Sequence, residues 1–85
     1  MNYVYVLLSE FDNQFYTGAT SDLKSRLQKH NNGQVPSTSS RRPLTLVYYE
    51  ACISQADAFR REKYLKTGMG KRYLRNRLKD SLAEL

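Results

Sequence analysis

The chain begins with two apolar runs separated by a short, largely polar segment, a pattern typical of a β-hairpin. Residues 2–9 (NYVYVLLS) are almost all apolar, aromatic or β-branched, and residues 14–20 (QFYTGAT) form a shorter, more mixed run. Residues 10–13 between them predict the turn. Residues 44–53 (LTLVYYEACI) return to strand composition, so we expect a third strand beside the hairpin.

One short helix is expected between the hairpin and the third strand. Thr20 or Ser21 is predicted to cap a helix that runs to residue 31 or 32, where Gly33 provides a left-handed stop. Leu23 and Leu27 lie one turn apart and define its buried stripe. Residues 33–43 (GQVPSTSSRRP) are rich in Gly, Pro, Ser and Thr, which predicts an exposed loop.

Two further helices are expected after the third strand. Ser54 begins the first of them, with Asp57 three residues later as a capping acid, and Gly68 ends it. The second spans approximately residues 71–82, with leucines on one face and basic residues on the others. The order ββαβαα predicts an α+β fold, with a small antiparallel three-stranded sheet flanked by helices.

Length and cysteine content limit the class of protein. The 85 residues predict a single domain, residues 1–85, whose core is thin because a chain this short buries only about 60 to 65% of its unfolded surface. Cys52 is the only cysteine, which is consistent with a reducing compartment. The apolar amino-terminal run is too short to span a bilayer. We therefore expect a soluble, cytoplasmic protein with no membrane partner.

Positive charge is unevenly placed along the chain. The net charge is +6, and all fourteen Lys and Arg residues lie between positions 24 and 79. This asymmetry favours a polyanionic partner, because each neutralised phosphate releases counterions. The predicted nucleic-acid contacts are Arg41 and Arg42 in the loop and Lys71, Arg72 and Arg75 in the last helix. The alternative is that these charges only keep the surface solvated.

The hairpin carries two tyrosine motifs, YVY at residues 3–5 and YTG at residues 16–18. Such a hairpin places Tyr5 and Tyr16 on neighbouring strands, where side chains on one face stand about 4.5 to 8 Å apart. Arg26 and His30 are spaced i, i+4, so they share one edge of the first helix and can reach toward the sheet. Gly18 permits a bulge or a close approach that a Cβ would obstruct.

Glu62 lies beside the apolar face of the second predicted helix, near Ala58 and Leu65. A carboxylate in such a position needs a partner. One interpretation is an ion pair with Lys66 at i+4, in the favourable order. The other is a metal ion.

Taken together and in this order, these residues resemble the GIY-YIG nuclease family over nearly the whole chain, and the chain is similar to the N-terminal catalytic domain of the bacterial incision nuclease of DNA excision repair. The resemblance implies that Tyr5, Tyr16, Arg26, His30 and Glu62 are catalytic, and that Glu62 is also the metal ligand. The family's late asparagine is matched by Asn76, across a small insertion at residues 68–70. Ala19 stands where some members carry a lysine.

The resemblance implies an endonuclease that hydrolyses DNA phosphodiester bonds with Mg²⁺ or Mn²⁺. One glutamate is a sufficient protein ligand, because Mg²⁺ keeps several of its waters. The cation and Arg26 would share the charge on the phosphate, while Tyr5 and Tyr16 hold the attacking water. A free phenol has a pKa of about 10 and is a poor base. Whether a tyrosine or His30 accepts the proton stays open.

Two other functions are compatible with the sequence. One is a nucleic-acid-binding domain that keeps the nuclease fold with weak or no activity, which Ala19 and the distant match at Asn76 permit. The other treats the basic last helix as a protein-interaction surface. A chain of this length has no room for a targeting module, so a homodimer or a separate partner would have to supply specificity. The remaining tyrosines are expected to pack, or to stack on bases where exposed.

Overall fold

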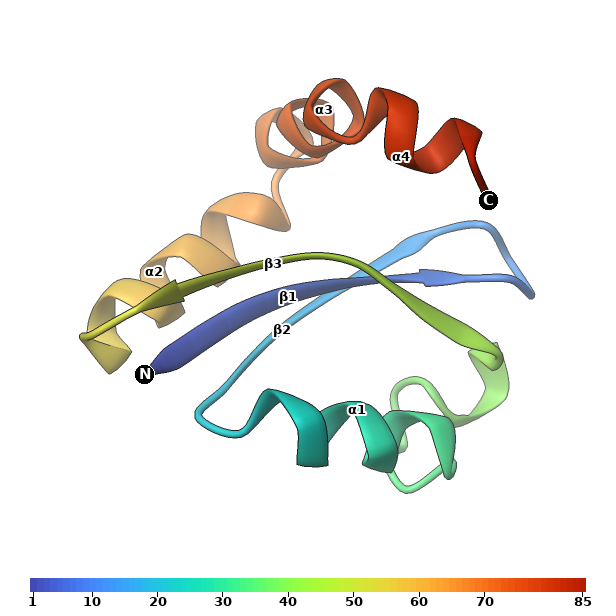
Figure 1. Cartoon of the computed structure of the whole chain (residues 1–85), viewed down its shortest axis with the longest axis horizontal. Coiled ribbons are helices and arrows are strands. Elements are labelled where there is room, and N and C mark those ends of the chain that lie inside the picture. The colour runs from blue at the N-terminus through green and yellow to red at the C-terminus, as the bar shows by residue number, and fades with distance from the viewer.

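The computed structural model describes all 85 residues. Its three strands, β1 (Asn2–Ser9), β2 (Phe15–Thr20) and β3 (Leu44–Cys52), form one antiparallel sheet in the order β2-β1-β3. The predicted α+β fold and the position of the third strand beside the hairpin are confirmed (Figure 1). Because β1 is central, its side chains are covered on both faces, and this is the strand that carries Tyr5.

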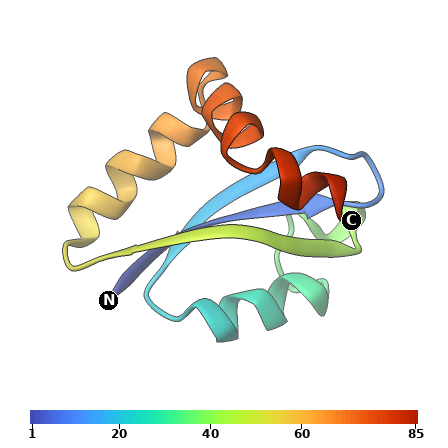
Figure 2. The ribbon, with the colours of Figure 1, turned by 45° about the horizontal axis from the view of Figure 1, so that its top comes forward.

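Helices cover the two faces of the sheet unequally. Helix α1 (Leu23–Asn31) lies against one face, whereas α2 (Gln55–Leu65), α3 (Gly68–Arg77) and α4 (Lys79–Ala83) lie on the other (Figures 1 and 2). The loop between α1 and β3 contains one turn of 3-10 helix, η1 (Ser39–Arg41). No helix is both long enough and apolar enough to cross a membrane.

Successive side chains of β1 point to opposite faces of the sheet and therefore contribute to two separate cores. Val4 and Val6 pack beneath α2 and α3, where the buried leucines of those helices meet them. Tyr5 and Leu7 point to the opposite face and pack toward α1, together with the partly buried Leu27. The thin second core is therefore built around a tyrosine, and its hydroxyl needs polar partners inside the protein.

The first helix begins differently from the prediction. Asp22, and not Thr20 or Ser21, is the cap, because its carboxylate accepts a hydrogen bond from the Ser25 amide at 3.1 Å. Thr20 ends β2, and its hydroxyl is already used to accept from the Asp22 amide at 3.1 Å. The stop predicted at Gly33 is confirmed by a φ of +74°.

The boundary between α2 and α3 also differs from the prediction, and Thr67 explains why. Its hydroxyl accepts from the Gly70 amide at 3.1 Å, so Thr67 caps α3, while α2 already ends at Leu65. Gly68 is consequently the first residue of α3 and not the stop of α2. The last predicted helix is present, but it starts earlier and is divided at Leu78, which separates α3 from α4.

An ion-pair network joins β3 to α2. The Arg61 guanidinium donates to both carboxylate oxygens of Glu50 at 2.8 to 3.1 Å, and the Tyr48 hydroxyl donates to the same carboxylate at 2.8 Å. Burial and the bond to Glu50 raise the pKa of Tyr48 to about 12. Burial acts to raise the pKa of Glu50, but hydrogen bonds from Arg61 and Tyr48 hold it below the usual value. This network is structural.

Candidate active site

Tyr5 owes its position to Gly18. The two residues are direct partners in the β1–β2 ladder, and a Cβ at Gly18 would lie 2.5 Å from the Tyr5 hydroxyl oxygen. The phenol ring therefore lies across the glycine. Of the two reasons expected for Gly18, the structure shows the close approach; the bulge of the sheet lies elsewhere, between Val6 and Leu7 in the pairing with β3.

The Tyr5 hydroxyl is the centre of a polar cluster under α1. It lies 2.7 Å from His30 Nε2 and 3.4 Å from Arg26 Nε, and Tyr5 is only 1% exposed. Burial is the main cause that raises the pKa of Tyr5, although the hydrogen bond from Arg26 opposes it. Burial and the charge of Arg26 lower the pKa of His30. Both side chains are therefore neutral near pH 7.

Tyr16 completes this cluster from the neighbouring strand. Its ring centroid lies 6.5 Å from that of Tyr5 and 5.1 Å from that of His30, in an edge-on arrangement with the imidazole. The pKa of Arg26 is raised chiefly by its hydrogen bond to Tyr5, and Tyr16 contributes to the same effect. Tyr16 and Arg26 are only half-buried, unlike Tyr5 and His30. The structure thus brings four of the five predicted catalytic residues together on the α1 face.

Thr38 is a member of this cluster that sequence reasoning missed. Its hydroxyl lies 2.8 Å from His30 Nδ1 and 3.4 Å from the carbonyl oxygen of Val35, and the residue has no exposed surface. The loop composition predicted exposure for residues 33–43. No spacing in the sequence distinguishes Thr38 from the serines around it, because only the fold of the loop turns it inward.

Glu62 stands apart from the four clustered residues. It lies on α2, and its Oε2 accepts a hydrogen bond from Lys66 Nζ at 3.0 Å, the i, i+4 pair that the sequence offered as one interpretation. Burial is the main reason for the raised pKa of Tyr5, and the negative charge of Glu62 adds to it. The carboxylate is therefore within electrostatic reach of the tyrosine without touching it.

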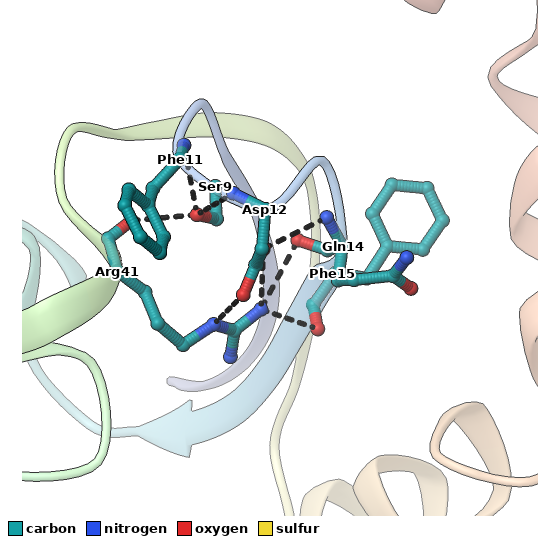
Figure 3. Close-up of polar contacts among 6 residues, drawn as sticks. All are labelled: Ser9, Phe11, Asp12, Gln14, Phe15 and Arg41. Carbon is teal, nitrogen blue, oxygen red and sulfur yellow. Dashed lines mark hydrogen bonds and ion pairs between the residues drawn. The ribbon is translucent and has the colours of Figure 1, made fainter.

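Arg41, one of the predicted nucleic-acid contacts, makes hydrogen bonds within the protein. Its guanidinium donates to Asp12 Oδ2 at 2.8 Å and to the carbonyl oxygens of Gln14 and Phe15, as Figure 3 shows. The Ser9 hydroxyl donates to the Arg41 carbonyl at 2.6 Å. These bonds tie the loop before β3 to the β1–β2 hairpin. Nε and Nη2 of Arg41 make these bonds and Nη1 makes none, so the predicted phosphate contact of Arg41 stays a prediction.

The other predicted nucleic-acid contacts are exposed. Arg42 is an exposed residue that donates from Nε to the Ser39 carbonyl at 2.9 Å, and its guanidinium lies close to Gly33. On α3, Lys71, Arg72, Arg75 and Asn76 are all exposed. The Arg75 guanidinium lies over the Phe15 ring, 4.8 Å from its centroid. Helix α3 covers the face of the sheet opposite α1.

A hollow of about 430 Å³ lies beside the amino-terminal half of α1. Its walls include Tyr3, which lies two residues before Tyr5 on the same face of β1, and Tyr49, the partner of Tyr5 on β3. Leu23 and Leu27 of α1 close the opposite side. The hollow is therefore adjacent to the cluster but does not include it, and Tyr49 in its wall is 54% exposed.

Comparison with known proteins shows the family to which the chain belongs. The GIY-YIG catalytic domain family matches residues 1–79. The chain belongs to the GIY-YIG family. A UPF0213 protein of Staphylococcus haemolyticus is 42% identical over 67 residues, which cover 78% of this chain and 80% of the relative. A UPF0213 protein of Clostridium perfringens is 43% identical over 67 residues, covering 78% and 71% respectively.

A solved structure extends the comparison to three dimensions. The solution NMR structure of the UPF0213 protein BH0048 from Bacillus halodurans aligns with a TM-score of 0.55 at 37% identity, covering 87% of this chain and 82% of that one. Membership of the GIY-YIG family supports an endonuclease-type function and makes nucleic acid the substrate class. In this GIY-YIG chain the two tyrosines, the arginine and the histidine meet in one cluster, together with Thr38.

Proposed function

We propose that the protein is a metal-dependent endonuclease that hydrolyses phosphodiester bonds in DNA, with Mg²⁺ or Mn²⁺. The observation that carries the proposal is the cluster in which Arg26 lies against Tyr5 and beside Tyr16, in reach of solvent. A guanidinium offers several fixed donors to phosphate oxygens, and a neighbouring phenol can hold a water in line with the phosphorus. The basic charge of the chain, +6, favours a nucleic-acid substrate.

The two tyrosines have different tasks in this proposal, because their exposure differs. Tyr5 is 1% exposed and His30 has no exposed surface, so neither can touch the scissile phosphate or its water without rearrangement. Tyr16 and Arg26 are half-buried and form the part of the cluster that a substrate meets. Tyr16 orients the attacking water, and Arg26 stabilises the charge that develops on the non-bridging oxygens.

The residues of the chain fit a single divalent cation. Metal dependence is general among GIY-YIG nucleases. Glu62 would hold the cation, because it is the carboxylate whose negative charge acts on Tyr5. The protein contains no group of three or more His, Cys, Asp or Glu side chains that could hold a metal ion, so Glu62 would be a single protein ligand. One carboxylate completed by waters and substrate phosphate suits Mg²⁺. When bound, the cation supplies Lewis-acid polarisation of the phosphate. Lys66, whose side chain is 53% exposed, would swing toward solvent.

A plasmid-nicking assay with and without Mg²⁺ or Mn²⁺ tests the proposal. The wild type should nick supercoiled DNA only with the cation, and Glu62→Gln and Arg26→Ala should remove nicking. Glu84→Gln is the matched control, because Glu84 is an exposed glutamate near the carboxyl terminus. Cleavage by the wild type that persists in EDTA, or full cleavage by Glu62→Gln, would contradict the assignment.

A second candidate function is a nucleic-acid-binding domain without cleavage. The observation that favours it is the ion pair between Glu62 and Lys66, which leaves the carboxylate satisfied without a cation. The same assay separates the two functions. A wild type that never nicks DNA or RNA, but binds either with a steep dependence on salt, supports the binding domain.

A further inference from the structure

The buried contacts under α1 form one continuous hydrogen-bond chain. It runs from the Val35 carbonyl through the Thr38 hydroxyl to His30, then through the Tyr5 hydroxyl to Arg26, with link lengths of 3.4, 2.8, 2.7 and 3.4 Å. Each interior member is at most 1% exposed, and no buried side-chain polar atom of the protein lacks a partner.

The two ends of this chain determine its direction. Arg26 Nε–H can only donate, so it occupies an acceptor position on the Tyr5 oxygen. The remaining neighbour of that hydroxyl is His30 Nε2, so the Tyr5 proton must be donated there. At the other end, the Val35 carbonyl can only accept, and the Thr38 hydroxyl donates to it.

His30 is thereby held in one tautomer. Its Nε2 accepts from Tyr5, so the ring proton sits on Nδ1 and is donated to Thr38 Oγ1. With the proton on Nε2 instead, the Tyr5 oxygen would face two donors and its own proton would have no acceptor in a closed site. Leaving a buried donor unpaired carries a large free-energy cost, so the alternative tautomer is strongly disfavoured.

We propose that Thr38 is a positioning residue of the active site: its hydroxyl selects the Nδ1–H tautomer of His30, which orients Tyr5 as the acceptor that aims Arg26 at the substrate phosphate. The effect on cleavage rests on the proposed function, whereas the tautomer and the Arg26 hydrogen bond do not. Thr38 touches neither substrate nor cation and acts entirely through its neighbours. The anchored loop around Arg41 keeps Thr38 in place.

NMR spectroscopy of the ¹⁵N-labelled full chain tests this directly. In the wild type at pH 7, His30 should show a protonated Nδ1 and a bare Nε2, and the Arg26 Nε–H should give a protected resonance. Thr38→Ser keeps the hydroxyl and should preserve both signals. Thr38→Val keeps the shape but cannot accept from Nδ1, so His30 should shift toward the Nε2–H tautomer and the Arg26 Nε–H should lose its protection.

Cleavage kinetics provide the functional arm. Partners that orient metal-ligating histidines typically contribute roughly 10- to 100-fold, and by analogy we expect a kcat loss near the lower end for Thr38→Val, with KM little changed and rescue by Thr38→Ser. Ser39→Ala is the matched control, because its hydroxyl bonds only to the Pro36 carbonyl.

The NMR test and the cleavage test can contradict the inference and the proposed function independently. A wild type with the proton on Nε2, or a Thr38→Val protein that keeps both wild-type signals, would overturn the inference whatever the activity. If Thr38→Val does not fold, the wild-type tautomer and Thr38→Ser still decide it. If the protein shows the expected NMR signals of His30 and Arg26 but never cleaves nucleic acid, the proposed function is refuted. The hydrogen-bond chain would then serve only to orient Arg26 for binding.

Discussion

The Tyr5 hydroxyl lies 2.7 Å from His30 Nε2, and both side chains are closed off from solvent beneath α1. In this pair the tyrosine donates and the neutral imidazole accepts. The pair is therefore part of the framework of the site, while the half-buried Tyr16 and Arg26 form its reactive edge.

The first prediction separates the two tyrosines. Tyr5→Phe leaves His30 Nε2 and Arg26 Nε without their buried partner, so it should reduce the free energy of unfolding by about 1 to 3 kcal/mol and also lower cleavage. Tyr16→Phe should change stability by about 0.5 kcal/mol or less and still abolish cleavage. Urea unfolding and plasmid nicking measure the two effects. Equal destabilisation by both substitutions would contradict this division.

The second prediction concerns the buried histidine and pH. Burial and the charge of Arg26 lower the pKa of His30 in the folded protein, where its ring packs against Tyr5 of β1 and Tyr16 of β2. The unfolded chain therefore binds a proton more readily, with a pKa of about 6.5. Stability from this group is fully present above that pKa and is lost as the pH falls below it toward the folded value. Thermal melts between pH 7.5 and about pH 5 should show falling Tm in the wild type and a flatter profile in His30→Gln.

The third prediction contrasts two paired glutamates. Glu62→Gln removes a partly exposed i, i+4 pair and should cost about 0.5 kcal/mol, yet abolish cleavage. Glu50→Gln breaks the bidentate bond to Arg61 and should cost about 1 to 2 kcal/mol after allowance for solvent screening, with cleavage retained. Thermal melts with and without millimolar Mg²⁺ provide the measurement. A stability loss of about 3 kcal/mol or more for Glu62→Gln would identify it as a buried structural ion-pair partner and remove it from the cation site.

The fourth prediction tests the close approach at Gly18. Gly18→Ala places a Cβ 2.5 Å from the Tyr5 hydroxyl, so the ring must move and its bonds to His30 and Arg26 must break. We expect a loss of about 2 kcal/mol or more in stability, together with loss of cleavage. Gly68→Ala is the control, since nothing lies within 4 Å of a Cβ there, and in the first turn of α3 it should be neutral or stabilising by up to about 1 kcal/mol. An active, stable Gly18→Ala protein would show that Tyr5 is not held by this packing.

The fifth prediction distinguishes the adjacent arginines of the loop. Arg41→Ala should lower stability because it releases the hairpin from the loop, as seen in the bonds of Figure 3. Arg42→Ala should leave stability nearly unchanged and reduce the salt dependence of DNA binding by about one phosphate contact. Binding isotherms at several salt concentrations, beside urea unfolding, give both quantities. An unchanged slope for Arg42→Ala would place the loop off the path of the nucleic acid.

Local patterns in the sequence predicted most of the fold. The run at residues 2–9, the turn after it and the strand at 44–53 are each specified by neighbouring residues, and strand alternation sends Tyr5 and Val6 to opposite faces. The errors lie at element ends. Thr20 and Thr67 both have side chains that can cap, and which neighbour uses each hydroxyl depends on how the chain turns.

Part of the candidate site could be predicted from the sequence as well. Tyr5, Tyr16, Arg26 and His30 are linked by hairpin geometry and by the i, i+4 spacing of one helix, so their meeting follows from short-range rules once the helix packs on the hairpin. The different environments of the two tyrosines could not be predicted from the sequence. Exposure divides the tyrosines into one buried and one reachable, and exposure is a property of the whole packed molecule.

Sequence patterns alone predicted the strands, the helices, the apolar faces and the family, because each is encoded in residues close together along the chain or in a motif read in order. The partners of several polar side chains became known only from the packed structure. Thr38 faces His30, and Arg41 pairs with Asp12. Such pairings depend on differences of an ångström or two between segments far apart in sequence, where a hydrogen bond either forms or does not.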